Sequence, residues 1–379
     1  MQAIAGSDLT YPYSKHPTAG TTIEVKPGVF WLTMPMGGGS LNHINLYLLE
    51  DSDGWFIVDT GLATRETKDH WITIFESQLK QKPVKGVICT HMHPDHVGQA
   101  GMITDRYRVP LYMTVSEYYQ ARSMFSGFSM QSSWISKEFY ARAGMDTSFM
   151  EQMSSSWRKR MPQAMKAIQE SGASQPTFPT GFRRIAEGDV FSIGDHDWQV
   201  VTGSGHSPEH ACLYCKTLKT LISGDQILPI ITSNVSVHPT EPDANPLKNW
   251  MDSHDKFLDV NPETFVLPAH NLPFFGVRER LRELINHHED RMLAVEEHCV
   301  SPQTAKALLP VMFKRKLDAR QTMMALGEAI AHCHLLMHRN RLERNLVDGV
   351  YRFTSIDPDL TRRAHPGQHD APDDTPILV

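Results

Sequence analysis

The sequence predicts an α/β fold in which two β-rich halves flank a helical insertion and precede a helical C-terminal domain. Short apolar runs of strand length, separated by turn residues, indicate the two β-rich halves. Histidines and aspartates directly follow several of these runs, at the strand ends where layered α/β folds place their sites. At 379 residues the chain exceeds the size at which one hydrophobic core usually stops growing, so we expect two domains.

The first β-rich half opens with three predicted strands, over residues 29–33, 44–49 and 55–58. The dipeptide Asp53-Gly54 is typical of a hairpin turn and precedes the third strand. Apolar spacing then predicts a helix over 64–80 and a further strand over 84–89. The segment THMHPDH follows this strand and occupies the loop beyond its carboxyl end.

A helical insertion separates the two halves. Helical spacing rich in Met and aromatic side chains runs from 115 to 172, and we set the bounds of the insertion at 115–180. Short strands return afterwards, over residues 198–201, 210–215, 219–223 and 264–267. The second half therefore repeats the β-rich character of the first.

The C-terminal part reads as three helices and a small hairpin. The helices are predicted over 278–298, 301–313 and 320–338, and the hairpin turns at Asp348-Gly349. Such an arrangement is typical of a winged helix. We therefore expect three parts: a larger domain over 22–275, a winged-helix-like domain over 276–356, and a disordered tail over 357–379 that has little to bury.

Composition narrows the class of protein. With 40% hydrophobic residues, 21% charged residues and a formal net charge of -6, the chain has no general attraction to nucleic acid or to an anionic membrane. Neither a secretory leader nor a membrane span is apparent, so we expect a cytoplasmic protein. The five cysteines form an odd, scattered set, which favours reduced thiols. Cys212 and Cys215 are three apart in a predicted strand and should point to opposite faces, which argues against a zinc or dithiol pair.

The histidines and aspartates at strand ends form a metal-ligand pattern. His91 and His93 alternate in a loop and can aim at one point, while Asp95 and His96 can turn toward a second. Two ions need more ligands than these four, and further candidates each end an apolar run: Asp59, His206, Asp225 and His270. Histidine nitrogen and carboxylate oxygen suit zinc or a similar divalent first-row metal. The sequence therefore predicts a two-metal site.

These motifs, in this order, resemble the metallo-β-lactamase-fold superfamily, and the resemblance covers roughly residues 22–275. It implies a four-layer αββα sandwich with a dinuclear site that holds zinc by default, iron or manganese being alternatives. It further implies that one metal is bound by His91, His93 and His206, and a second by Asp95, His96 and His270. Asp225 is then expected to bridge the two metals. Asp59 is expected to contact the ligands without binding a metal itself.

The chemistry implied by the resemblance is hydrolysis, because such ions activate water and polarise a carbonyl or phosphoryl oxygen. Asp95 is then a candidate proton acceptor. His210 stands where related hydrolases often repeat a histidine, so it is a candidate for hydrogen-bonding a substrate oxygen. The alternative for His210 is a strand-start histidine bonded to a neighbour.

Several branches of the superfamily fit less well. Asp225 stands where many true zinc β-lactamases supply cysteine, and His93 stands where flavodiiron oxygen reductases have glutamate. The segment between Asp225 and His270 is too short for the nuclease domain that the RNA-processing branch carries there. The remaining relatives resemble glyoxalase II, acyl-thioesterases, acyl-homoserine lactonases and small endoribonucleases.

We therefore expect a hydrolase of a small-molecule thioester or ester, like glyoxalase II or an acyl-CoA thioesterase. An endoribonuclease or phosphodiesterase of the same fold, or a lactonase, is the alternative, and a non-catalytic winged-helix regulator is a third hypothesis. The winged-helix-like domain lacks a basic stripe, so we interpret it as a packing or dimerisation module of a possible homodimer that does not bind nucleic acid.

The insertion also offers a substrate hypothesis. Trp134, Phe139 and other apolar side chains of the insertion are candidates for a cover over the metals, although such a stripe is also typical of an ordinary core. The run Arg158-Lys159-Arg160 is a candidate contact for a CoA phosphate, or else a solvated charged face.

Overall fold

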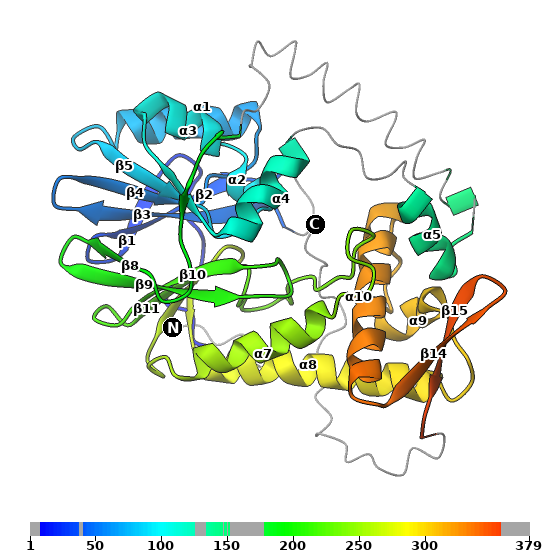
Figure 1. Ribbon diagram of the computed structural model, residues 1–379. Coiled ribbons are helices and arrows are strands. Elements are labelled where there is room, and N and C mark those ends of the chain that lie inside the picture. The colour runs from blue at the N-terminus through cyan, green and yellow to red at the C-terminus, as the bar shows by residue number, and fades with distance from the viewer. Residues whose placement is uncertain are drawn as a thin grey trace. The chain divides into compact units, whose positions relative to one another are not determined.

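The structure is a computed structural model that describes residues 8–37, 41–125, 134–146, 148–149, 151 and 178–357 (Figure 1). Most of the expected tail and much of the helical insertion, including Arg158-Lys159-Arg160, lie outside the described residues.

The chain divides into two compact units. The first unit comprises Met1–Phe128, Lys166–Ile230 and Ser253–Leu281. The second comprises Ser129–Met165, Ile231–Asp252 and Arg282–Val379. The part of the insertion around helix α5 is thereby grouped with the C-terminal helices, and the domain bounds expected from the sequence stay predictions.

Seven strands form the first sheet, in chain order across the sheet. They are β1 (Thr22–Lys26), β2 (Val29–Pro35), β3 (His43–Asp51), β4 (Gly54–Val58), β5 (Val84–Ile88), β6 (Leu111–Met113) and β7 (Arg183–Arg184). Pairing is antiparallel from β1 to β4 and parallel from β4 to β7. The three strands predicted at the start of the chain and the turn before β4 are confirmed.

Six strands form the second sheet, in the order β13-β12-β11-β10-β9-β8. They are β8 (Val190–Ile193), β9 (His196–Gly203), β10 (His210–Cys215), β11 (Thr220–Gly224), β12 (Phe265–Pro268) and β13 (Phe274–Phe275). Within this sheet β11 and β12 pair in parallel and the other neighbours pair antiparallel. Both sheets are therefore mixed.

Alternation along β3 shows how the layers form. Leu46 and Leu48 face a core that includes Trp71 of α1 (Arg65–Glu76) and Ile103 of α3 (Ala100–Tyr107). Tyr47 and Leu49 point the other way, into a core shared with the second sheet. Helix α7 (Pro246–Leu258) flanks that second sheet, where Lys256 Nζ donates to the Thr202 carbonyl at 3.0 Å. The predicted α/β sandwich of two sheets flanked by helices is confirmed.

Helix α1 is set by its caps and its apolar face. The Thr64 side chain accepts the Thr67 backbone N–H at 3.1 Å, and Trp71, Ile74 and Phe75 bury one face. The helix is shorter than the predicted 64–80, because Ser77 leaves the helical conformation and its hydroxyl donates to the Thr73 carbonyl.

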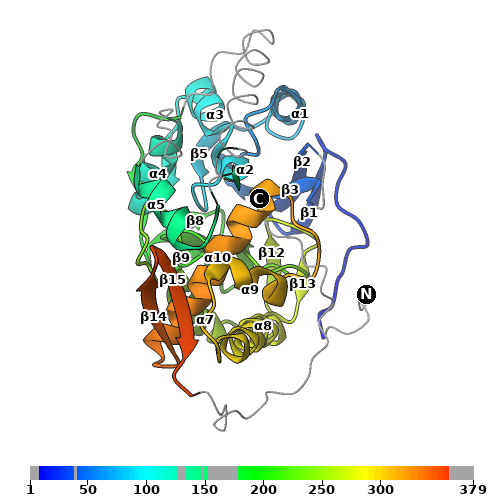
Figure 2. The same cartoon turned by 90° about the vertical axis from the view of Figure 1, so that its right-hand side faces the viewer.

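The C-terminal part has the predicted helices and hairpin (Figure 2). They are α8 (Val277–His298), α9 (Ala305–Met312), α10 (Ala319–His338), β14 (Leu342–Val347) and β15 (Val350–Ser355). Asp348 and Gly349 have φ values of 51° and 78°, as a two-residue hairpin turn requires. Asp318 and Gln321 form a capping box at the start of α10.

Strand register brings the candidate ligands together. Val58 pairs with Ile88 in the parallel β4–β5 pair, so Asp59 and the loop with His91 leave the first sheet at the same edge. In the second sheet, β11 and β12 also run parallel, so Asp225 and His270 leave at one edge. The loop from β9 to β10 carries His206.

Candidate metal centre

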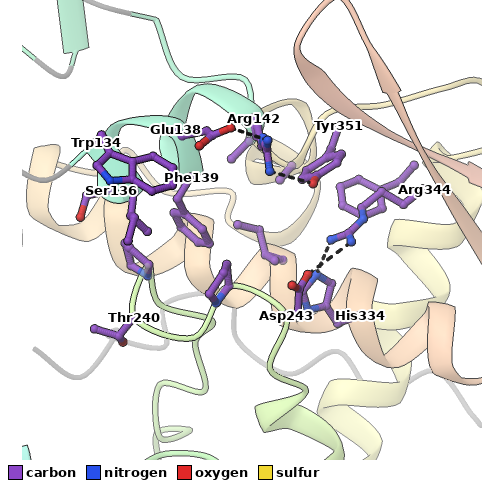
Figure 3. A pocket seen from close by; sticks show the side chains of 17 residues that line it. Trp134, Ser136, Glu138, Phe139, Arg142, Thr240, Asp243, His334, Arg344 and Tyr351 are labelled. Atoms are coloured by element: carbon purple, nitrogen blue, oxygen red, sulfur yellow. Dashed lines mark hydrogen bonds and ion pairs between the residues drawn. The ribbon is translucent and has the colours of Figure 1, made fainter.

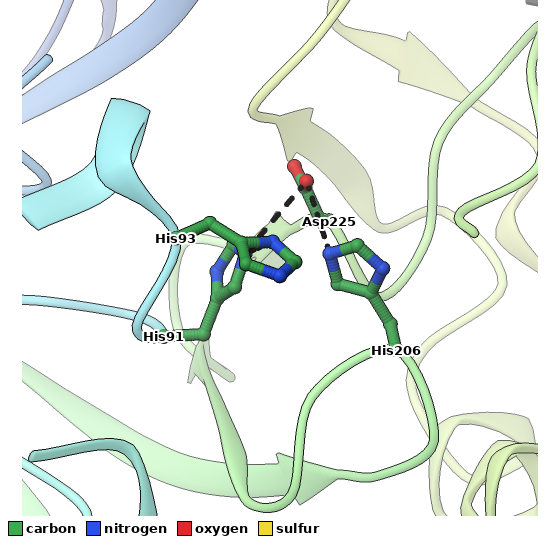
Figure 4. Close-up of side chains that lie close together, drawn as sticks. All are labelled: His91, His93, His206 and Asp225. Carbon is green, nitrogen blue, oxygen red and sulfur yellow. Dashed lines mark hydrogen bonds and ion pairs between the residues drawn. The ribbon is translucent and has the colours of Figure 1, made fainter. Parts of the chain in front are cut away.

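The first ligand cluster contains His91, His93, His206 and Asp225 (Figure 4). Asp225 Oδ2 lies 3.3 Å from His206 Nε2 and 3.8 Å from His91 Nε2. His93 Nδ1 lies 2.9 Å from His91 Nε2. All four side chains are buried except that of His93, which is partly exposed.

The second cluster contains Asp95, His96 and His270, all buried. Asp95 and His96 belong to the short helix α2 (Pro94–Val97), whose first residue, Pro94, fits the start of a helix. Asp95 Oδ2 lies 3.6 Å from His96 Nε2 and 3.4 Å from His270 Nε2. The same two nitrogens each lie 3.5 Å from Asp225 Oδ1. Asp225 therefore turns one carboxylate oxygen toward each cluster.

These separations fit ligands that share a cation. Zinc ligands of this kind lie about 2.0–2.2 Å from the ion, so two of them in a tetrahedron are about 3.3–3.6 Å apart. The separations between the Asp225 oxygens and the histidine nitrogens run from 3.3 to 3.8 Å. His96 Nε2 and His270 Nε2 are buried and make no hydrogen bond of ordinary geometry within the described part of the chain. The cluster is typical of a dinuclear metal site.

Neighbouring groups fix the orientation of the histidines. His96 Nδ1 donates to Asp59 Oδ2 at 2.8 Å, which aims its Nε2 at the second cluster. Asp59 Oδ1 accepts the Thr90 backbone N–H at 2.8 Å. His270 Nδ1 donates to the His43 carbonyl at 3.2 Å. Asp59 has a φ of 61°, a conformation that aspartate tolerates and that is common at functional sites.

The electrostatics suit cation binding. Burial, reinforced by neighbouring histidines, lowers the pKa of His91 well below its usual value, so its nitrogen is unprotonated. Burial alone raises the pKa of Asp225, but His270 and His96 outweigh it and hold that pKa well below the usual range. Burial also opposes charge on His96, yet three nearby carboxylates raise its pKa well above normal. The centre thus stabilises positive charge, and metal ligands must be deprotonated to bind.

His210 contacts the backbone of Asp225. It is buried, and its Nε2 accepts the Asp225 backbone N–H at 3.1 Å. A Cβ at Gly224 would lie 2.6 Å from that nitrogen, so only glycine fits there. This contact corresponds to a histidine bonded to a neighbour, and the catalytic role expected for His210 stays a prediction.

Glu117 is a positioning residue that the sequence analysis missed. It lies buried on α4 (Val115–Phe125), and its carboxylate accepts the backbone N–H of Met92 at 2.9 Å and of Glu209 at 2.7 Å. Met92 lies between His91 and His93, and Glu209 lies in the loop that carries His206. The Glu117 carboxylate therefore connects two loops that carry metal ligands. Burial raises its pKa despite these hydrogen bonds. No sequence signal marks it, because its partners lie 25 and 92 residues away.

The second unit contains another buried group, formed by His288, Glu328 and His332. His288 Nδ1 and His332 Nε2 are 3.1 Å apart, and His332 Nδ1 donates to the Glu328 carbonyl at 2.7 Å. The Glu328 carboxylate pairs with Arg291 at 3.1 Å and accepts from Asn234 at 3.1 Å. These groups are already paired by the protein, as expected for packing residues on helices.

Paired sheets with two His/Asp clusters at their edge define a metallo-hydrolase. The chain belongs to the metallo-beta-lactamase superfamily, whose family model matches residues 39–270. A second family model, described as "Metallo-beta-lactamase-like, C-terminal domain", matches residues 292–356. The chain thus has the fold and the His/Asp cluster of a metallo-hydrolase of this superfamily.

Two curated relatives have described activities. The chain is 26% identical over 211 residues to the human acyl-coenzyme A thioesterase MBLAC2, covering 53% of this chain and 63% of the relative. It is 22% identical over 262 residues to a linear primary-alkylsulfatase from a Pseudomonas species, covering 67% of this chain and 46% of the relative. The chain therefore spans less than two thirds of the length of each.

One solved structure is similar over nearly the whole chain. It is a beta-lactamase domain protein from Burkholderia ambifaria, which is 40% identical, has a TM-score of 0.81, and matches over 92% of this chain and 98% of that one.

No helix among the described residues has the length and apolar character needed to cross a membrane. All five cysteines are buried free thiols.

Proposed function

We propose that this chain hydrolyses thioesters or esters with two metal ions, and that acyl-CoA thioesters are its substrate class. The position of Asp225 between the two clusters supports the proposal of two metal ions, because each of its carboxylate oxygens is within 3.5 Å of a histidine from a different cluster. The similarity to an acyl-coenzyme A thioesterase supports the substrate class. Glyoxalase II-like thioesters are the related alternative.

Each ligand has a proposed role. One ion, zinc by preference, is assigned to His91, His93 and His206, and the other to Asp95, His96 and His270, with Asp225 shared. Such ions, when bound, supply the Lewis acidity that activates water and polarises a carbonyl oxygen.

The chain's own groups hold this arrangement. Asp59 orients His96, Glu117 fixes two ligand loops, and the Asp95 carboxylate is the proposed proton acceptor. We further propose a small-molecule substrate, no nucleic-acid partner, a homodimer, and a reducing compartment such as the cytoplasm, in keeping with the five free thiols.

A sulfate ester is the second candidate substrate. The match to the alkylsulfatase covers 67% of this chain, more than the match to the thioesterase does. Both activities act on a substrate that joins an apolar chain to an anionic group, so the same centre is compatible with either.

A substrate screen tests the proposal. The purified, metal-loaded chain would be offered acyl-CoA thioesters, glutathione thioesters, lactones, alkyl sulfates, phosphodiesters and RNA, with Asp225→Ala as the inactive control. We expect thioester hydrolysis with the highest kcat/KM. Hydrolysis of RNA or phosphodiesters alone would contradict the proposal, and alkyl sulfates alone would favour the second candidate.

A further inference from the structure

The second unit contains a pocket of about 590 Å³ that the metal centre does not use (Figure 3). Its walls come from α5 (Trp134–Arg142), the loop 239–243, α10 and the β14–β15 hairpin. The volume lies within the range of roughly 300–1,000 Å³ that is usual for small-molecule sites. All of its lining residues belong to the second unit.

One side of the pocket is apolar. Phe139 and Ile330 line it, and Trp134 stands at its rim with 71% of its surface exposed. Figure 3 shows Trp134 on the opposite side of the pocket from Arg344, with Phe139 between them. A large exposed indole beside a concave apolar surface is typical of a binding site rather than of a sealed core.

The hairpin explains how polar groups reach the pocket. Arg344 pairs with Phe353 across the hairpin, and Tyr351 lies two residues from Phe353. Because side chains alternate along a strand, these three share one face. Arg352 pairs with Asn345 and lies on the opposite face.

Two guanidinium groups gather at this polar side. The Arg344 guanidinium lies 4.3 Å from the centre of the Tyr351 ring, and that of Arg142 lies 5.5 Å from it. Arg142 also donates to the Tyr351 hydroxyl at 3.2 Å and pairs with Glu138. Because the Tyr351 hydroxyl accepts this hydrogen bond, its own O–H can donate to an acceptor in the pocket.

Arg344 is the less neutralised of the two. His334 Nδ1 donates to the Ala244 carbonyl at 2.7 Å, so His334 Nε2 is a neutral acceptor for Arg344 at 3.2 Å. The acidic partner, Asp243, is 3.4 Å away and its side chain is 81% exposed. A ligand carboxylate can displace Asp243 at little cost, because water already solvates that side chain.

We propose that this pocket binds an amphipathic carboxylate, such as a medium-chain fatty acid. Its apolar chain lies against Trp134, Phe139 and Ile330, and its carboxylate accepts from Arg344 and from the Tyr351 hydroxyl. The pocket shares no residue with the metal ligands, so the proposal does not depend on the proposed hydrolytic function.

Calorimetric titration of the full, metal-loaded chain with decanoate tests this. Decyltrimethylammonium, which has the same chain and the opposite charge, is the ligand control. We expect one decanoate per chain, with the cation binding at least about tenfold more weakly, since a carboxylate–guanidinium hydrogen bond is charge-assisted. Arg344→Gln should raise the Kd for decanoate by about tenfold or more, and Trp134→Ala should weaken it several-fold.

Two further variants locate the site. Arg352→Gln removes a charge from the other face of the hairpin and should leave the Kd unchanged. Asp225→Ala alters the metal centre and should also leave it unchanged. The proposal would be overturned by no binding to the unaltered chain, by equal binding of both ligands, by equal effects of Arg344→Gln and Arg352→Gln, or by loss of binding in Asp225→Ala.

Discussion

The metal centre and the group formed by His288, Glu328 and His332 are both buried and both combine histidine with carboxylate. They differ in what their polar atoms contact. In the metal centre, His96 Nε2 and His270 Nε2 lie 3.4–3.6 Å from carboxylate oxygens, the separation expected of ligands that share a cation. Histidine rings contact each other in both groups, at 2.9 Å between His91 and His93 and at 3.1 Å between His288 and His332, but in the helical group an arginine also neutralises the glutamate.

The difference shows that burial and residue type alone are not sufficient to form a metal site. A site also needs several donor atoms that converge on one point, because a buried polar atom without a partner is costly and a cation can supply that partner. Strand ends meeting at a sheet edge provide such convergence. Helix faces, as in α8 and α10, instead allow close side-chain pairs.

The largest expected effect is that of Asp225→Ala. Loss of the shared carboxylate should reduce kcat/KM by roughly 10³ or more, because it removes an interaction worth several kcal/mol in the transition state. Circular dichroism should show an unchanged fold. Asp195→Ala, at an exposed loop position, is the matched control and should retain activity. Near-normal activity of Asp225→Ala with both metals bound would contradict the shared role.

Glu117→Gln should weaken metal binding by about 10- to 100-fold, the usual effect of losing a group that orients ligands. The amide keeps only one acceptor for the two backbone N–H groups that the carboxylate now binds. Competition with a chelator measures the affinity. Glu66→Gln is the control, since Glu66 is also a first-turn acid but is exposed. Equal affinities of the two variants would show that Glu117 does not position the loops.

His332→Ala should lower stability without affecting metal content or activity. It leaves buried partners such as His288 without their hydrogen bond, which costs about 1–3 kcal/mol of unfolding free energy. Urea unfolding at constant metal concentration measures this. His338→Ala, exposed on the same helix, should change stability by no more than about 0.5 kcal/mol. Loss of a metal ion in His332→Ala would remove the distinction between the two groups.

The effect of each single methylene added to the acyl chain should be the smallest. Each added methylene that is buried contributes about 0.8 kcal/mol, nearly a factor of four in kcat/KM, until the space that holds the acyl chain is filled. If the insertion covers the metals, Trp134→Ala flattens this dependence. If Trp134 serves only the pocket in the second unit, the profile is unchanged. A flat profile in the unaltered chain would contradict an acyl substrate and favour short, polar thioesters.

Much of the fold follows from sequence because its signals are local. The strands around Leu46 and Val58 are apolar runs bounded by turns, and the C-terminal hairpin is marked by Asp348-Gly349. Shorter elements such as β7 and β13, of two residues each, carry no periodicity and were missed. Their pairing depends on longer neighbouring strands.

The candidate site was predictable to a similar degree. His206, Asp225 and His270 each end an apolar run, and parallel strands bring such ends to one edge. The supporting contacts were less predictable. Glu117 acts through backbone amides far away in sequence, and His210 faces the Asp225 amide because of the glycine at 224. Such contacts depend on the assembled fold and not on local pattern.

Metal content measured by elemental analysis tests the central claim most directly. The chain would be purified without chelator, offered zinc, iron or manganese, and freed of unbound metal. We predict two equivalents per chain in the unaltered protein and in His332→Ala, and fewer than two in Asp225→Ala. One equivalent or none in the unaltered chain would contradict the two-metal centre, and a third equivalent lost in His332→Ala would contradict the contrast between the two buried groups.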